Sequence, residues 1–371
     1  MKILEKTLLL LLLAALPAQA EESRPMLEQL GIRIGRLPRG PLNAITDVAG
    51  VRVGHKTIIR GDDIRTGVTA ILPHGGNPFL EKVPGAVETF NGFGKLIGST
   101  QVNELGRIES PIVLTNTLCV ARAADAVLTY LLGLPGMEKV QSINPLVAEN
   151  NDGYLNDIAS RAVTESDVLE AIRSAGEGPV EQGSVGAGTG TGCLGYKGGI
   201  GSSSRIVEIG GQKYTVGVLV QTNFGGRLTV NGVTLEEPGT GEPSGRGGSC
   251  VIVAATDAPI GSRNLKRLAR RCFAGMARTG ADFSNGSGDY AIGFSTHPDF
   301  REVSGGGPFE RTRTPLSNEA ASPLFLAAAE ATEEAIIASV LAATTLRGRD
   351  GHVREALDIE KLKSALRRAG K

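Results

Sequence analysis

Short apolar runs bounded by glycine and proline recur along the chain and predict β-strands. The segment 213–221 alternates, with apolar residues at every second position. The segment 249–255 is apolar without interruption after its first residue, which is typical of a strand that is buried on both faces. We expect further strands at 51–59, 67–72, 112–114 and 290–294.

Apolar residues at helical spacing predict helices between these strands. After Ser262, an expected N-cap, apolar side chains recur at every third or fourth position as far as Met276. An alanine-rich stretch at 324–344 predicts a long helix, and Asp358 is expected to cap a short last helix. We expect two more helices, at 117–132 and 166–174. Because strands and helices alternate in blocks, the pattern predicts stacked layers of sheet and helix.

Residues 1–20 have the pattern of a secretory signal peptide. Two lysines form a positive region, an apolar run follows from position 7, and small residues at 18 and 20 mark a cleavage site before Glu21. The run is shorter than the roughly 20 apolar residues that a membrane span needs. We therefore expect an exported protein, periplasmic or secreted, that has no membrane attachment once the signal peptide is removed.

Composition limits the function classes. The 39 Lys and Arg residues balance 39 Asp and Glu residues, whereas a nucleic-acid binder usually carries a basic excess, so we expect no nucleic-acid partner. Hydrophobic residues make up 41% of the chain and charged residues 21%, which excludes an acidic disordered chain. The four cysteines have no metal-ligand spacing, so we expect buried free thiols, with one or two disulfides as the alternative.

The junction between Gly248 and Ser249 is the most unusual feature of the sequence. A loop rich in glycine and proline, 236–248, leads directly into the buried strand. One interpretation is a surface loop followed by a strand-start serine. The other is a self-cleaving precursor, because the Gly248 carbonyl has no side chain to shield it and the Ser249 hydroxyl can attack it. The freed α-amine of Ser249, with a reference pKa of about 8, can then serve as the base for its own hydroxyl.

The histidines do not support a hydrolase of the Ser-His-Asp type. They are scattered in turn-like contexts, and no Gly-x-Ser-x-Gly elbow lies between a strand and a helix to partner them. A second glycine motif, 186–192, is close to a dinucleotide-binding fingerprint. No clear buried strand precedes it, so we interpret it as backbone packing near the active cleft.

The sequence around the junction, Arg246-Gly-Gly-Ser249-Cys-Val-Ile-Val-Ala-Ala-Thr-Asp257, resembles the processing site of the DmpA-type aminopeptidases. This is the L-aminopeptidase/D-esterase and β-aminopeptidase family, peptidase family S58. Further blocks match in family order over nearly the whole mature chain, at 43–55, 65–74, 91–95, 152–157, 186–190, 197–201, 285–289 and 348–352.

The resemblance implies roles for individual residues. Ser249 corresponds to the nucleophile at the start of the C-terminal chain, and Asn223 to the asparagine that donates a hydrogen bond to the oxyanion. Ser287 and Asp289 correspond to a serine and an acid near the nucleophile's amine. An extended segment would put this pair on one face, because side chains two residues apart in a strand point the same way.

The resemblance also implies a substrate-binding side. Glu149 corresponds to the acid that holds the substrate's free ammonium group. The family pattern has a tyrosine two residues after this acid, assisting the oxyanion, but Asn151 stands there. Tyr154 is the tyrosine of the same loop, and whether it substitutes is open.

As a whole, the resemblance implies a four-layer αββα sandwich, similar to the N-terminal-nucleophile hydrolases but with a different connectivity. It implies one hydrolase domain over 21–371, cut into an α chain, 21–248, and a β chain, 249–371, that stay associated in a homotetramer. The expected enzyme needs no metal or cofactor and releases N-terminal amino acids from short peptides, amino-acid amides or esters. The alternatives are a related pantetheine-type amidase or acyltransferase of the same fold, and a non-catalytic periplasmic binding protein.

Overall fold

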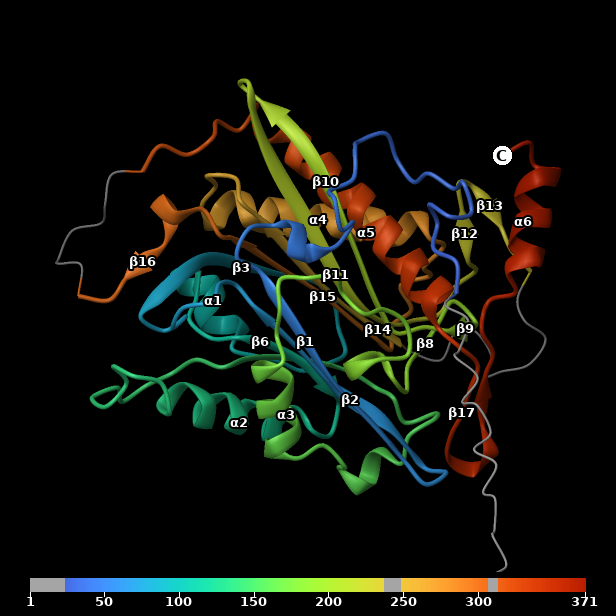
Figure 1. The fold of residues 1–371 in the computed structure, drawn as a ribbon, viewed down its shortest axis with the longest axis horizontal. Coiled ribbons are helices and arrows are strands. Elements are labelled where there is room, and N and C mark those ends of the chain that lie inside the picture. The colour runs from blue at the N-terminus through green and yellow to red at the C-terminus, as the bar shows by residue number, and fades with distance from the viewer. Residues whose placement is uncertain (1–23, 237–247, 306–312) are drawn as a thin grey trace, which may run out of the picture.

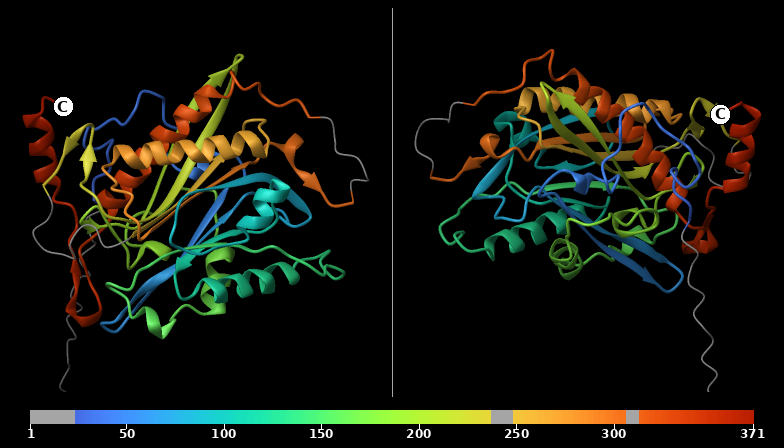
Figure 2. Two further views of the ribbon diagram at one scale, coloured as in Figure 1. Left: turned by 180° about the vertical axis from the view of Figure 1, so that it is seen from behind. Right: turned by 45° about the horizontal axis from the view of Figure 1, so that its top comes forward.

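The computed structural model describes residues 24–236, 248–305 and 313–371, so the predicted signal peptide and most of the predicted processing loop lie outside the described residues. Two mixed β-sheets stack face to face, with helices on both outer faces (Figures 1 and 2). This is the predicted αββα arrangement. None of the helices within the described ranges is both long and apolar enough to cross a bilayer.

The larger sheet has seven strands and carries the predicted buried strand at its centre. Along it the order is β10 (Ile200–Ile209), β11 (Gln212–Asn223), β14 (Gly248–Thr256), β15 (Ser287–Ser295), β3 (Glu81–Gly92) and β16 (Glu302–Val303), and β5 (Arg107–Ile108) also pairs with β3. The central strand β14 is antiparallel to β11 and parallel to β15.

The smaller sheet has five strands in the order β1 (Arg52–Arg60), β2 (Ile64–Leu72), β6 (Ile112–Asn116), β7 (Leu146–Asn150) and β4 (Leu96–Ile97). The other elements are the hairpins β8 (Gly192–Cys193) with β9 (Tyr196–Lys197), β12 (Thr229–Val230) with β13 (Val233–Thr234), and β17 (Leu346–Arg347) with β18 (Val353–Arg354). The α-helices are α1 (Ser99–Leu105), α2 (Val120–Leu132), α3 (Glu165–Arg173), α4 (Ser262–Arg278), α5 (Ser322–Ala342) and α6 (Ile359–Arg368).

Three hydrophobic clusters fill the spaces between the layers. One packs α4 and α5 against the seven-stranded sheet, and another packs α2 and α3 against the five-stranded sheet. The third lies between the two sheets and includes Val251, Val253 and Ala255 of β14. Alternate residues of β14 therefore enter two different cores, which explains why its sequence is apolar at nearly every position.

The predicted helices and strands are present, with shifts of a few residues at their ends. Asp358 caps α6 as expected, because its side chain accepts hydrogen bonds from the amides of Glu360 and Lys361. The prediction that Ser262 caps α4 was wrong. Ser262 is the first helical residue, and Gly261 occupies the N-cap position in an extended conformation. The sequence patterns did not predict β3, β7 or β10.

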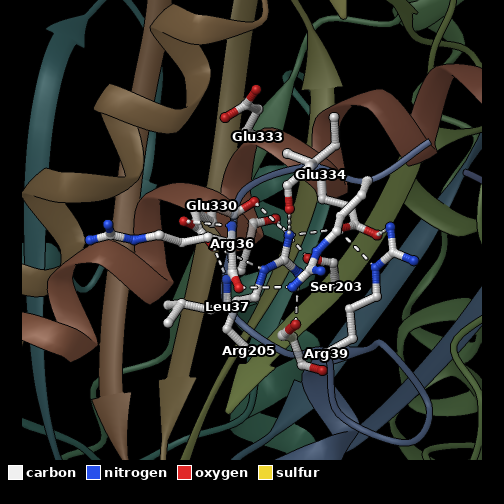
Figure 3. A network of polar contacts seen from close by, with 12 residues as sticks. Arg36, Leu37, Arg39, Ser203, Arg205, Glu330, Glu333 and Glu334 are labelled. Carbon is white, nitrogen blue, oxygen red and sulfur yellow. Dashed lines mark hydrogen bonds and ion pairs between the residues drawn. The ribbon is translucent and has the colours of Figure 1, made fainter. Parts of the chain in front are cut away.

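A buried charge network ties the N-terminal segment to the sheet and to α5 (Figure 3). Arg205 of β10 has no exposed surface, and its guanidinium lies 2.6 Å from Glu334 Oε2 and 3.4 Å from Glu330 Oε2. Glu330 also accepts hydrogen bonds from the amides of Arg36 and Leu37. These contacts hold the chain before β1 against α5 and β10.

Candidate active site

Ser249 lies at the start of β14, where the central strand enters the core, and is 3% exposed. The register of the sheet puts Asn223 of β11 opposite it on one side and Gly288 of β15 on the other. Gly248 continues into this strand from the predicted processing loop. A Cβ at Gly248 would lie 2.7 Å from the Cα of Phe224, so the close approach of β11 requires glycine here.

Ser287 and Asp289 flank the Ser249 position from β15, as their spacing in an extended segment predicts. In the parallel register Ser287 pairs with Gly248, and Asp289 pairs with Cys250. The Ser287 hydroxyl donates to Asp289 Oδ1 at 2.8 Å, and Asn91 Nδ2 donates to Oδ2 at 3.0 Å. Burial raises the pKa of Asp289, and the two hydrogen bonds oppose that rise.

The side-chain amide of Asn223 is held at both ends. Its Oδ1 accepts from the amide of Gly192 at 3.1 Å, and its Nδ2 donates to the carbonyl of Asn151 at 2.8 Å. The side chain of Asn151 is itself occupied in a turn, where it accepts from the amide of Gly153. Asn151 therefore reaches Asn223 through its backbone, a contact that does not depend on which side chain stands at this position.

Glu149 lies on β7, a strand of the five-stranded sheet, and is 2% exposed. Its carboxylate accepts hydrogen bonds from the Lys95 amide at 3.0 Å and from the Thr117 hydroxyl, and Lys95 Nζ lies 3.8 Å away. Burial raises the pKa of Glu149, while these donors favour the charged form. The result is a fixed carboxylate that can accept a hydrogen bond from a cationic ligand.

These groups surround one cavity of about 610 Å³, which we call the active-site cavity. Its walls include six of the predicted site residues: Gly248, Ser249, Asn223, Glu149, Asn151 and Tyr154. The volume is typical of a small-molecule site. Within the described ranges, no three His, Cys, Asp or Glu side chains form a group that could hold a metal ion.

The glycine motif that resembles a nucleotide-binding fingerprint packs by its backbone instead. Residues Gly186–Gly188 form a 3₁₀ turn, and a Cβ at Gly188 would lie 2.4 Å from the amide nitrogen of Ile200. Gly190 and Gly192 line the active-site cavity. Cys193 follows them, and all four cysteines are buried free thiols, as the sequence predicted.

Sequence reasoning assigned no role to several residues of the site. Asn91 bonds to Asp289, while Thr117 and Lys95 hold Glu149. Asn91 and Lys95 lie in the block 91–95, which resembles the family pattern, so the sequence did indicate this segment as part of the site. Arg354 lies in the cavity wall next to Tyr154 without such an indication.

Comparisons with known proteins identify the family of the chain. Residues 43–354 match the pattern of peptidase family S58. Beta-peptidyl aminopeptidase BapA of Sphingosinicella microcystinivorans is 40% identical over 95% of this chain and 94% of its own length.

Two solved structures have the same fold. A Burkholderia sp. beta-aminopeptidase has a TM-score of 0.86 at 38% identity, covering 94% of this chain and 99% of its own. The L-aminopeptidase D-Ala-esterase/amidase of Ochrobactrum anthropi, described as a variant of the Ntn hydrolase fold, has a TM-score of 0.87 at 36% identity, with the same coverage. Because both sequence and fold match over nearly the full length, the chain belongs to peptidase family S58 and is a hydrolase, an aminopeptidase.

Proposed function

We propose that the protein cleaves itself between Gly248 and Ser249 and then acts as an aminopeptidase whose nucleophile is the new N-terminal Ser249. The observation that supports this most strongly is the register at the start of β14. It brings a serine at the start of the central strand between an asparagine amide on β11 and a serine–aspartate pair on β15. Nucleophile, oxyanion donor and proton-handling groups are the parts that acyl transfer requires.

Self-processing would begin with attack of the Ser249 hydroxyl oxygen on the carbonyl carbon of Gly248. The C–N bond of that peptide breaks, the nitrogen of Ser249 gains the proton of the hydroxyl, and Gly248 remains as an ester. Water hydrolyses the ester and leaves a carboxylate on Gly248 and a free amine on Ser249. The products are an α chain, 21–248 after removal of the signal peptide, and a β chain, 249–371.

Catalysis on a substrate would repeat the same chemistry. The freed amine of Ser249 accepts the hydroxyl proton as the oxygen attacks the substrate carbonyl, and Asn223 Nδ2 donates to the developing oxyanion. Ser287 and Asp289 hold the amine in position. The leaving amine takes the proton, and one water molecule releases the N-terminal amino acid from the ester on Ser249.

Glu149 is the group that we assign to the substrate's free ammonium, which makes the enzyme an exopeptidase. Substrates would be short peptides, amino-acid amides or esters with an unblocked amine. The Sphingosinicella relative and the Burkholderia structure are named for β-peptides or β-amino acids. Their similarity extends the proposal to substrates with an N-terminal β-amino acid.

We further propose that the protein is exported and assembles as a homotetramer of processed protomers. The pattern of residues 1–20 supports export. Intact mass of protein secreted from a heterologous host tests the signal cleavage before Glu21, and light scattering tests the tetramer.

The test of self-processing is intact mass and a denaturing gel of wild type and Ser249→Ala. We expect two chains for wild type, the smaller starting at Ser249, and one uncleaved chain for Ser249→Ala with no turnover of an aminoacyl p-nitroanilide. Ser304→Ala, which changes an exposed serine, serves as the matched control and should be processed and active. A wild-type preparation that is active as one full-length chain would refute the proposal.

A further inference from the structure

The active-site cavity has charged side chains in two walls that come from different parts of the chain. Glu149 of β7 lies in one wall, with Lys95 and Thr117 around it. The other wall is the β17–β18 hairpin near the C-terminus, which contributes Arg349, Asp350, His352 and Arg354, and Arg349 pairs with Asp350. Figure 1 shows this hairpin on the same side of the molecule as β8 and β9.

Glu149 approaches Ser249 from the β15 side. Gly94 links the two, because a Cβ at Gly94 would lie 3.3 Å from Glu149 Oε1. A Cβ at Gly288, the β15 partner of Ser249, would in turn lie 3.2 Å from the Cα of Gly94. These contacts place the carboxylate against β15, near the position that pairs with Ser249.

Arg354 approaches from the β11 side. A Cβ at Gly192 would lie 2.9 Å from Arg354 Nε, so the glycine leaves room for the guanidinium. The amide of the same Gly192 donates to Asn223 Oδ1, and Asn223 is the β11 partner of Ser249. A negative group therefore lies near the β15 partner of Ser249, and a positive group lies near its β11 partner.

The position of the Arg354 guanidinium is fixed by aromatic stacking. It lies 4.3 Å from the centre of the Tyr154 ring, and the ring of His352 stacks on Tyr154 at 4.5 Å with an angle of 4°. His352 Nδ1 is 2.9 Å from the carbonyl of Tyr154, which fixes the imidazole. The hairpin is also bonded to the body of the protein, since the Arg349 amide donates to the carbonyl of Leu155 at 2.9 Å. A guanidinium held in this way loses little entropy when it binds an anion.

We propose that Arg354 binds the carboxylate of the leaving amino acid, and that the enzyme is a peptidase for zwitterionic short peptides, dipeptides foremost. In a dipeptide the ammonium and the carboxylate lie on either side of the scissile amide, which matches the order Glu149, Ser249, Arg354. The planar guanidinium can bind a carboxylate through two parallel hydrogen bonds. This inference rests on the proposed function, and it assigns Tyr154 and His352 as positioning residues for Arg354.

The experiment compares kcat/KM for dipeptides with a free carboxylate and for the same dipeptides as C-terminal amides. The probes are L-alanyl-glycine, β-alanyl-glycine, their glycinamides, and the two alanyl p-nitroanilides. Whichever alanyl group the enzyme releases, L-alanyl or β-alanyl, we expect kcat/KM of wild type to be about 10- to 100-fold higher for the dipeptide with a free carboxylate than for its amide. This is the range of a charge-assisted hydrogen bond. In Arg354→Gln this ratio should fall to near one.

The matched control is Arg347→Gln, which removes the same charge from an exposed residue of the same hairpin. It should keep the wild-type ratio, and Arg354→Lys should keep more of the ratio than Arg354→Gln. The inference is wrong if wild type cleaves acid and amide equally, or if Arg354→Gln keeps the preference. If wild type released no amino acid from any of these probes, the anilides included, the proposed function itself would fail.

Discussion

At the scale of single residues, the site shows how burial and hydrogen bonds act against each other on one carboxylate. Glu149 is almost fully enclosed, which disfavours its charged form, yet the Lys95 amide and the Thr117 hydroxyl both donate to it. The first effect is the larger, so the pKa of Glu149 lies above its ordinary value of 4.5. Glu149 must be charged to bind an ammonium ion. On acidification it therefore loses its charge at a higher pH than an exposed glutamate does.

This predicts an acid limb in substrate binding. As the pH falls below neutrality, Glu149 takes up a proton before an ordinary glutamate does, and KM for an aminoacyl p-nitroanilide should rise. Glu149→Gln should raise KM about 10- to 100-fold at neutral pH, because a charge-assisted hydrogen bond is lost. It should also remove the rise of KM on the acid side. Steady-state kinetics from pH 5 to 8 test this, and persistence of the same acid limb in Glu149→Gln would assign the titration to another group.

At the scale of secondary-structure elements, the spacing of apolar residues predicted those strands and helices whose residues follow one regular hydrophobic pattern. The strand β14 and the helices α4 and α5 were predicted closely, because their apolar residues follow a single period or a continuous run. The strand β10 was missed because Ser202–Ser204 lie in its middle. In the structure these serines are buried, and the Ser202 and Ser203 hydroxyls donate to the carbonyls of Val218 and Ala331.

The residues of the site were likewise predictable where a local motif contains them. Motifs matched in sequence pointed to Ser249, Asn223 and the Ser287–Asp289 pair, because each falls within a short block or next to a strand. The position of Arg354 in the cavity wall was not predictable, because Arg354 reaches the cavity only when the C-terminal hairpin docks beside Tyr154. Contacts between segments about 200 residues apart leave no local pattern in one sequence.

The Arg205 network joins a strand, a helix and the N-terminal segment, and it predicts a measurable stability difference. Replacing Arg205 by Met leaves the buried carboxylate of Glu330 without its Arg205 partner and that of Glu334 with Arg39 alone, a loss of up to about 3–5 kcal/mol in the free energy of unfolding. The control is Arg278→Gln, which breaks the half-exposed pair of Arg278 with Glu333 and should cost at most about 1 kcal/mol. Urea denaturation in the Ser249→Ala background keeps one covalent chain in every sample. Equal losses in the two variants would contradict the argument.

At the scale of the whole molecule, the proposed cut divides the chain without dividing the fold. The strands β14 and β15 of the C-terminal piece lie between β11 and β3 of the N-terminal piece in one sheet. The helices α4 and α5 of the C-terminal piece cover that same sheet, and Arg205 bonds to α5 across the division. Neither piece can keep its core without the other, because the hydrophobic cluster beneath these helices draws residues from both.

The processed chains should therefore stay together as tightly as a folded domain holds its own elements. In size-exclusion chromatography under native conditions, the α and β chains of wild type should elute in one peak at the position of uncleaved Ser249→Ala. They should separate only in urea or guanidinium, at concentrations that also abolish the circular dichroism of the sheet and helices. The hydrogen bonds between strands, the buried apolar contacts and the buried ion pairs would be lost in the same step, because all three join the α chain to the β chain. Elution of a separate smaller chain without denaturant would show that the central sheet does not bind the two pieces together in this way.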